Sequence, residues 1–363
     1  MESYQYAFKT GELSIEQKRG IITLIPKKHK NRLFLKNWRP LSLLNTDYKI
    51  LAKVLAKRLE VILPLIINDD QTGYIKSRYI GQNIRTIEDI ISFTETYQLP
   101  GIILSVDFAK AFDTLNWHFI DVALQKFNIG TNMRKWISVM YHNIESAVIN
   151  NGTITPWFYL ERGVRQGCPM SAFLFIISVE LLALKIRQDP NISGIKIKDG
   201  EVKISQLADD TTCFISDINS LKSVIEVFHS FYNCAGLQLN KSKTKAKYIG
   251  TLKGRTHFPF DFAWTNENIQ SLGIIFTENE KDSYTLNFEP RISKMKQTLQ
   301  VWKQRHLSLK GKVTVINNLA LAPLIYIASA IAVPERVINE VNSIVYEFLW
   351  DSRKSKIAKN VII

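Results

Sequence analysis

Residues 202–216 read VKISQLADDTTCFIS, two short apolar runs joined at Asp209-Asp210. This pattern predicts two strands of a hairpin with both carboxylates at the turn between them. Neighbouring carboxylates in apolar surroundings repel each other and lose solvation, and a divalent cation relieves both effects. The alternative interpretation is an exposed turn, because Asp is a common turn residue.

A second stretch supplies a third carboxylate. Residues 102–106 read IILSV, a continuous apolar run that predicts a buried strand, and Asp107 stands at its end. Magnesium prefers carboxylate oxygens together with substrate phosphates. We expect Asp107, Asp209 and Asp210 to hold two magnesium ions, with manganese as an alternative. One ion would activate an attacking hydroxyl and the other would stabilise the leaving group.

The surrounding pattern predicts helices and further strands. Strands are expected at 21–25 and 237–249, and helices are expected at 116–127, 168–187 and 219–235, the last ended by Gly236. Another helix is expected to begin at Asn45 or Asp47 and to be closed by Pro64. Its predicted core-facing stripe consists of Ile50, Leu51, Val54, Leu55, Leu59 and Ile62.

The order of these elements predicts the fold class. A strand, a helix, a long helix, a hairpin, a helix and a strand indicate a mixed α/β (α+β) fold with a mainly antiparallel sheet covered by helices. In the last strand, lysines at 241, 243, 245 and 247 are expected to alternate along one face. Helices are also expected at 290–305, 309–322 and 336–350, which would form a smaller lobe.

The charge is unevenly distributed. The net charge is +14, and residues 1–60 carry 13 Lys/Arg against 5 Asp/Glu, whereas residues 61–239 carry 15 against 18. Residues 240–312 again carry an excess, 14 against 6. Two basic flanks suit a phosphate backbone and an acidic middle suits metal binding, although solvated lysines on a basic protein would give the same totals.

Cysteine usage and hydropathy exclude several classes of protein. The three cysteines form no CxxC pair, so neither a disulfide framework nor a zinc knuckle is supported, and a reducing compartment is expected. There is no signal peptide and no uncharged apolar run of membrane-spanning length, so no membrane partner is expected. The most apolar stretch, 313–333, contains Asn317 and Asn318 and predicts a buried helix pair broken near Pro323.

Several ordered segments resemble one family. SVDFAKAFDTLNW (105–117), RGVRQGCPMSAFLF (162–175), LADDTTCF (207–214) and GLQLNKSKTK (236–245) together resemble the reverse transcriptases, specifically the non-LTR (LINE-type) retrotransposon branch. Segments 20–31, 37–59, 71–84, 271–276 and 302–326 agree, so the resemblance covers nearly the whole chain. One departure is Leu207, where many relatives carry an aromatic residue before Ala-Asp-Asp.

The resemblance implies a domain architecture and a longer parent protein. It implies a right-hand polymerase, with a partial lead-in at 1–20, fingers and palm at 21–277, and a truncated helical, thumb-like region at 278–363. The chain resembles part of a polyprotein whose endonuclease would lie upstream. The implied location is the nucleus, by family alone.

The resemblance also implies roles for residues. Asp107, Asp209 and Asp210 match the metal ligands, and Lys243 matches a lysine proposed as general acid, with Lys241 and Lys245 as weaker alternatives. The nucleotide-binding residues implied are Lys27, Arg39, Phe112, Gln166 and Gly167. Phe112 would be a steric gate against a 2′-hydroxyl, although core packing would also explain an aromatic residue there.

Further positions are implied with less definition. Arg162 and Arg165 are candidates for template contact or solvated charges, and Leu272-Gly273 resembles the turn that holds the primer end. Asp113 and Asn116 are expected to have structural roles such as capping the helix near 116.

These roles imply an RNA-directed DNA polymerase that uses an RNA template, a DNA primer and dNTPs, and that primes on a nicked chromosomal 3′-hydroxyl. Two alternatives stay open: a catalytically inactive nucleic-acid-binding remnant, and an RNA-dependent RNA polymerase, which Phe112 disfavours.

Overall fold

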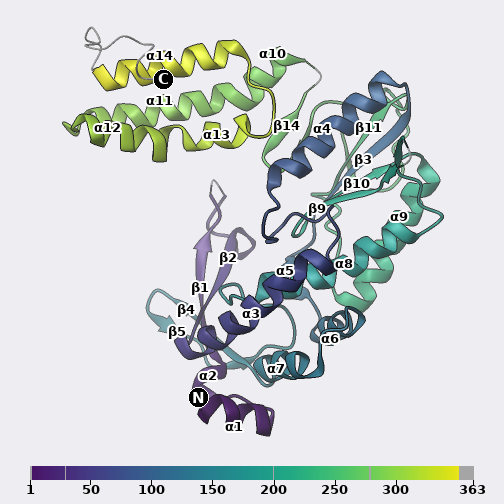
Figure 1. Cartoon of the computed structure of the whole chain (residues 1–363), viewed down its shortest axis with the longest axis vertical. Coiled ribbons are helices and arrows are strands. Elements are labelled where there is room, and N and C mark those ends of the chain that lie inside the picture. Colours follow the sequence, from purple (N-terminus) through teal and green to yellow (C-terminus); the bar gives the residue numbers. More distant parts are fainter. Residues whose placement is uncertain (1, 29, 199, 278, 351–363) are drawn as a thin grey trace. The chain divides into compact units, whose positions relative to one another are not determined.

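The structure is a computed structural model that describes residues 2–28, 30–198, 200–277 and 279–350 (Figure 1). The chain forms two compact units. The larger consists of Met1–Tyr79 and Thr94–Trp264, and the smaller of Ile80–Phe93 and the chain from Thr265 onward. Helix α4 (Ile80–Thr96) passes from one unit to the other. Each unit has its own buried apolar residues and is described separately.

The central sheet of the larger unit has the strand order β12-β11-β3-β10-β9. Its strands are β3 (Pro100–Val106), β9 (Ile204–Leu207), β10 (Asp210–Ile215), β11 (Lys245–Gly250) and β12 (Ala263–Trp264). All pairs are antiparallel except β11 with β12. The predicted strand before Asp107 and the hairpin at 202–216 are both present, and Ile102 and Leu104 on β3 are fully buried.

A second sheet lies in the same unit, with the order β2-β1-β4-β5 and β6 paired to β4. Its strands are β1 (Arg19–Pro26), β2 (Trp38–Leu44), β4 (Glu145–Asn150), β5 (Thr153–Ile154) and β6 (Phe158–Tyr159). A small separate hairpin pairs β7 (Ile195–Ile197) with β8 (Gly200–Val202). The strand expected at 21–25 is present but is only half-buried and includes Pro26.

The other helices of the larger unit pack mainly on one another, and α8 and α9 also contact β9 and β10 of the central sheet (Figure 1). They are α1 (Glu2–Thr10), α2 (Ile15–Lys18), α3 (Thr46–Ile66), α5 (Ala111–Thr114), α6 (Trp117–Lys126), α7 (Thr131–Tyr141), α8 (Ser171–Gln188) and α9 (Ile218–Ala235), with a 3₁₀ turn at Leu35–Asn37. Helix α8 is apolar on nearly all sides, so it is buried at the centre of the core. Pro169 precedes this helix instead of lying in its first turn.

Helix α3 corrects two predictions. Asn45 caps it as expected, but Pro64 lies inside the helix, which ends at Ile66. Of the predicted stripe, Leu51, Leu55 and Leu59 are buried, whereas Ile50 and Val54 are exposed. Ala52 and Ala56 take their places in the core, because the helix packs at close range and needs small residues there.

The smaller unit is a hairpin followed by helices. The hairpin pairs β13 (Ile269–Ser271) with β14 (Ile274–Phe276). The helices are α10 (Glu280–Ser283), α11 (Glu289–Lys303), α12 (Leu309–Val315), α13 (Ala322–Ala328) and α14 (Glu335–Trp350), with π-helical turns at Tyr284–Phe288 and Ile316–Ala320. The helices predicted at 290–305 and 336–350 are confirmed. The helix predicted at 309–322 consists of α12 followed by a π-helical turn that ends at Ala320.

The apolar stretch near Pro323 is a bent helix pair. Residues 309–320 and 322–328 meet at 51°. Val313, Leu319 and Ile325 are exposed, so the expectation that the pair is buried is wrong for these positions. Within the described ranges no single helix has the length and apolar character to cross a membrane, and this bent pair meets those two criteria only when its halves are taken together.

Candidate active site

Two adjacent strands bring the three predicted carboxylates to one end of the central sheet. In the antiparallel pair β3 and β10, Val106 lies opposite Thr211. Asp107 follows Val106 and Asp210 precedes Thr211, so both lie at the same end of the β3–β10 pair, one position beyond its last paired residues. Asp209 stands in the turn between β9 and β10. The structure thus brings Asp107, Asp209 and Asp210 together.

Burial and mutual repulsion act on the two hairpin carboxylates. Burial raises the pKa of Asp209, and the charge of Asp107 raises it further. Burial and then the charges of Asp209 and Asp107 raise the pKa of Asp210 to about 6. The Asp210 side chain keeps contact with solvent although protein surrounds it on most sides. The negative charge of Asp107 therefore disfavours the charged forms of Asp209 and Asp210, an effect that a bound cation would reverse.

Asp107 has polar partners from the segment that leads into β11. The Nζ of Lys243 lies 3.4 Å from Asp107 Oδ2, and the side-chain amide of Asn240 donates to the same oxygen at 3.0 Å. The backbone N–H of Asp107 donates to Thr244 Oγ1 at 3.3 Å. Sequence reasoning missed Asn240 and Thr244, although both lie within the 236–245 segment that carries the resemblance.

The predicted lysine ladder is wrong. Lys241 and Lys243 lie in a turn before β11, and only Lys245 and Lys247 are on the strand. Lys247 is buried, whereas Lys245 is exposed. The hydrogen bonds from Lys243 N and Thr244 N to Asn240 O close this turn and set the strand back. The turn directs Lys243 to an ion pair with Asp107.

Gln166 and Gly167 lie against β2. The N–H of Ser42 donates to Gln166 O at 2.7 Å, and the Gln166 amide donates to Asp113 Oδ1 at 3.0 Å. Gly167 has φ +117, and a Cβ there would lie 2.5 Å from Ser42 O. Only glycine fits this left-handed backbone so close to a neighbouring strand. Burial raises the pKa of Asp113, which acts as a structural acceptor for Gln166.

Phe112 lies just beyond the end of β3. Its ring stacks on Phe175 of α8 with the centroids 4.4 Å apart, and it is half-buried. Its carbonyl accepts a hydrogen bond from Val164 N at 2.7 Å, two residues before Gln166. The ring is therefore fixed by packing while part of its surface stays accessible. Asn116 caps α6, as predicted, by accepting from His118 N and Phe119 N.

Lys27 and Arg39 lie on the β1–β2 hairpin, where Ile25 pairs with Arg39. Lys27 is half-buried and donates to Lys36 O at 2.9 Å, whereas Arg39 is exposed. Burial lowers the pKa of Lys27, and the charges of Lys243 and Arg39 lower it further. These three cations therefore lie within one another's field, an arrangement that a bound polyanion would stabilise.

The segments that build this site match one family of proteins. The model of the reverse transcriptase (RNA-dependent DNA polymerase) family matches residues 25–276, which is more than half of the chain. The chain belongs to this family. The predicted reverse transcriptase of the non-LTR retrotransposon type is confirmed, and so is the predicted enzyme class.

The relatives of this reverse transcriptase are retrotransposon proteins. It is 31% identical over 350 residues to the transposon TX1 uncharacterized 149 kDa protein of Xenopus laevis, covering 95% of this chain and 26% of that protein. It is 27% identical over 209 residues to the retrovirus-related Pol polyprotein from type-1 retrotransposable element R2 of Popillia japonica, covering 57% and 29%. The chain thus spans less than a third of the length of either relative.

Solved structures confirm the fold class. Telomerase from Candida albicans in complex with a TWJ fragment of telomeric RNA has TM-score 0.51 and 13% identity, over 98% of this chain and 63% of the other. Apo telomerase from Candida tropicalis has TM-score 0.52 and 13% identity, over 93% and 63%. At this identity the likeness establishes a shared polymerase fold and no more.

One of the two arginines predicted as template contacts or solvated charges, Arg165, differs from expectation. Arg165 is buried, and it donates to Lys18 O at 2.7 Å and Glu145 O at 2.9 Å. It therefore ties the end of α2 to the start of β4 and is neither a solvated charge nor accessible to a template. Arg162 is exposed.

The Leu272-Gly273 turn lies in the smaller unit, between β13 and β14, and both residues have positive φ. Tyr326 Oη donates to the carbonyl of Leu272, and Arg291 donates to that of Gly273 at 2.8 Å. Its backbone carbonyls are thus already hydrogen-bonded within that unit.

Reverse transcriptases generally use divalent metal ions, and the carboxylates fit such ions in kind and place. They supply oxygen ligands at adjoining strand ends, where burial and neighbouring negative charge raise the pKa of Asp209 and of Asp210. Among the described residues, however, no three His, Cys, Asp or Glu side chains converge closely enough to surround a metal as they stand. The strands fix the backbone positions of the three aspartates, and the side-chain rotamers determine how closely the carboxylates approach one another.

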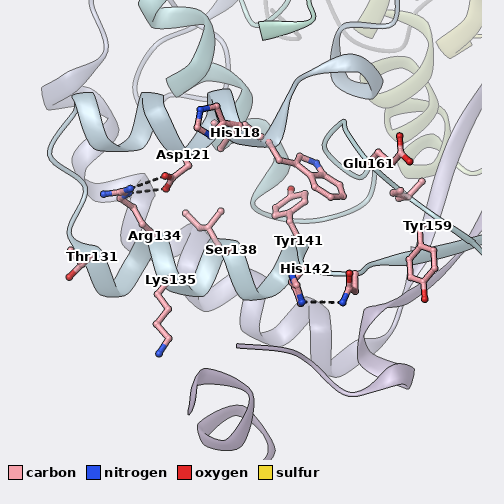
Figure 2. A pocket seen from close by; sticks show the side chains of 15 residues that line it. His118, Asp121, Thr131, Arg134, Lys135, Ser138, Tyr141, His142, Tyr159 and Glu161 are labelled. Carbon is pink, nitrogen blue, oxygen red and sulfur yellow. Dashed lines mark hydrogen bonds and ion pairs between the residues drawn. The ribbon is translucent and has the colours of Figure 1, made fainter. Parts of the chain in front are cut away.

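A separate cavity of about 740 Å³ lies between α6, α7 and the chain around Glu161 (Figure 2). One wall carries an ion pair in which Arg134 donates two hydrogen bonds to Asp121, at 2.8 and 2.7 Å. Trp117 in its wall donates to Gly163 O at 2.7 Å. None of the predicted catalytic or nucleotide-binding residues lines it. Its size alone therefore does not make it the active site.

Proposed function

We propose that this chain is the RNA-directed DNA polymerase core of a non-LTR retrotransposon, adding dNTPs to a primer 3′-hydroxyl on an RNA template. The observation that carries the proposal is the placement of Asp107, Asp209 and Asp210 at adjoining strand ends of one sheet, with raised pKa values on both hairpin aspartates. Family membership supports the same chemistry.

The three carboxylates would hold two magnesium ions, and manganese would replace magnesium in the same ligand set. When bound, such ions activate the attacking 3′-hydroxyl and neutralise charge on the α-phosphate and the leaving group. The carboxylates themselves position the ions. Lys243, already paired with Asp107, would donate a proton to the leaving pyrophosphate or stabilise its negative charge.

The incoming nucleotide would lie beside these groups. Lys27 and Arg39 would bind its triphosphate, as a point charge and a planar fork respectively. Gly167, packed against Ser42 of β2, would let its backbone approach the nucleotide closely, and the Gln166 amide, which donates to Asp113, would fix the sugar edge. Phe112, held by Phe175, would exclude a 2′-hydroxyl by contact.

The proposal extends to the partners and the cellular setting of the longer protein. We propose that an endonuclease in the remainder of that protein supplies a nicked chromosomal 3′-hydroxyl as the DNA primer, so the reaction would occur in the nucleus. The basic flanks at 1–60 and 240–312 suit the phosphates of the RNA template and the DNA primer. The proposed division into fingers and palm at 21–277 and a thumb-like region from 278 accords with this use.

The test is incorporation of a single nucleotide on a primed RNA template with magnesium, comparing dNTPs with NTPs. Extension with dNTPs and little with NTPs is expected. Extension with NTPs at equal efficiency would instead indicate an RNA-dependent RNA polymerase. Tight template binding with no extension by either nucleotide, in magnesium or manganese, would favour the inactive nucleic-acid-binding remnant.

A further inference from the structure

The residue before the first hairpin aspartate has an unusual backbone. Ala208 has φ +56, the left-handed region that residues with a Cβ rarely adopt outside glycine, Asn and Asp. Such a conformation persists only where neighbouring groups hold it. It sets the direction in which the chain enters Asp209 and Asp210, so whatever holds Ala208 also orients both carboxylates.

A buried glutamine from a distant segment holds this residue. Gln71 is fully buried, and its Oε1 accepts hydrogen bonds from Ala208 N and from Gly73 N, both at 2.8 Å. Its Nε2 donates to Ala208 O at 3.4 Å. One carboxamide therefore bonds both backbone polar groups of the residue that precedes Asp209.

The segment around Gln71 runs beside β9 like an added strand. Gln206 N donates to Asp70 O at 2.7 Å, and Thr72 N donates to Gln206 O at 2.9 Å, forming a parallel bridge between Gln71 and Gln206. Gly73 follows at very close range, since a Cβ there would lie 2.4 Å from Ala208 N. The backbone thus delivers the Gln71 amide directly to the turn.

Two arginines fix this segment from the side away from the turn. Arg78 donates to the carbonyls of Ile67 at 3.0 Å and Gln71 at 2.8 Å. Arg187 of α8 donates to Asp70 Oδ2 at 2.6 Å. The position of Gln71 is therefore tied to the helix at the centre of the core, not to a free loop.

We propose that Gln71 is a positioning residue for the metal-binding hairpin, orienting Asp209 and Asp210 through the backbone of Ala208. It touches none of the three carboxylates in these contacts and acts through the turn alone. The inference rests on the proposed function of the carboxylates, and it adds a residue that none of the expected catalytic or nucleotide-binding roles includes.

The test compares Gln71→Leu, which removes all three bonds, with Gln71→Glu, which keeps an acceptor for both N–H groups. Asn287→Leu is the matched control, because Asn287 is a fully buried amide in the other unit that bonds both backbone groups of Ile275 at 2.9 and 2.8 Å. Two readouts are taken below the melting temperature of each variant: Mn²⁺ affinity of the protein alone, by electron paramagnetic resonance of the free ion, and kcat and KM for dNTP addition.

Gln71→Leu is expected to weaken Mn²⁺ binding and lower kcat by on the order of 10–100-fold, with little change in template binding. Gln71→Glu should recover part of the loss, and Asn287→Leu should lower thermal stability without changing Mn²⁺ affinity. If Gln71→Leu does not fold, Gly73→Ala, which presses on Ala208 N while keeping the amide, should show the same loss.

Equal Mn²⁺ affinity and kcat in the wild type and the folded Gln71 variants would overturn the inference. Equal loss in Asn287→Leu would also overturn it, because the effect would then be general. A wild-type chain that synthesises no DNA but loses Mn²⁺ affinity on Gln71→Leu would contradict the proposed function and support the inference.

Discussion

Phe112 and Lys243 illustrate how single side chains acquire a role from the backbone that carries them. Phe112 is fixed by its stack on Phe175, so its ring cannot swing away from a bulkier sugar. Lys243 reaches Asp107 because it sits in a turn and not on a strand. Both roles are expected to be separable by substitution.

Phe112→Val should admit ribonucleotides. The smaller side chain leaves space for a 2′-hydroxyl, so the preference for dNTP over NTP in kcat/KM is expected to fall by about 10–200-fold, the range that one lost steric contact supplies. Competing incorporation of dNTP and NTP on the same primed RNA measures it. An unchanged preference would mean that Phe112 serves only core packing.

Lys243→Ala should lower kcat for nucleotide addition by on the order of 100-fold, since it removes the group aimed at the leaving pyrophosphate. Lys245→Ala is the matched control, an exposed lysine two residues further along. Pre-steady-state primer extension compares them. Equal effects of the two substitutions would assign Lys243 a general electrostatic role.

At the scale of elements, the sequence predicted the helix caps and strand ends that depend on neighbouring residues. Asn45 and Asn116 cap helices and Gly236 ends one, because these features depend on a few adjacent residues. The apolar run before Asp107 was sufficient to place a strand and its terminal carboxylate.

Tertiary packing decided the features that sequence reasoning missed. The exposure of Ile50 and Val54 depends on which face of α3 meets the core, and the burial of Arg165 depends on carbonyls that are distant in the sequence. The lysine ladder failed because a turn at Asn240 is invisible to a period-two pattern. Gln71 begins the 71–84 segment that agrees with the family, but no local pattern indicated its role, since its partner lies 137 residues away.

Gly236→Ala should destabilise the larger unit. Gly236 has φ +80 at the end of α9, and an added Cβ would lie 2.6 Å from Thr114 O. Strain and the clash are expected to lower the free energy of unfolding by about 1–3 kcal/mol. Gly130→Ala, where a Cβ meets nothing within 4 Å, is the control. Denaturant unfolding that ranked the two variants equally would refute this account of the cap.

At the scale of the whole larger unit, a charged cluster ties α8 to the segment that carries Gln71. Arg187 pairs with Glu180 on its own helix and with Asp70 at 2.6 Å. Glu180 has only 1% of its side chain exposed, and burial raises its pKa to about 7 despite the arginine. In the folded chain Glu180 therefore binds a proton below about pH 7. In the unfolded chain it does so only below its ordinary pKa of 4.5.

This sets a pH dependence with a definite sign. Between about pH 4.5 and 7 the folded state binds more protons at Glu180, so its contribution to stability is full below 4.5 and is lost as the pH rises through 7. Glu180→Gln should match the wild type at pH 4.5 and exceed its free energy of unfolding above pH 7 by on the order of 1–3 kcal/mol. Urea unfolding at both pH values measures this. A variant less stable than the wild type above pH 7 would show that the ion pair with Arg187 outweighs burial.

The central claim is that Asp107, Asp209 and Asp210 form the catalytic centre of a polymerase that copies RNA into DNA. The most direct test is extension of a primer on an RNA template with magnesium and dNTPs by the wild type, Asp209→Asn and Asp261→Asn, an exposed carboxylate elsewhere in the same unit. Full-length DNA from the wild type and Asp261→Asn, with template binding retained but extension lost in Asp209→Asn, is the predicted result. Undiminished extension by Asp209→Asn would contradict the claim.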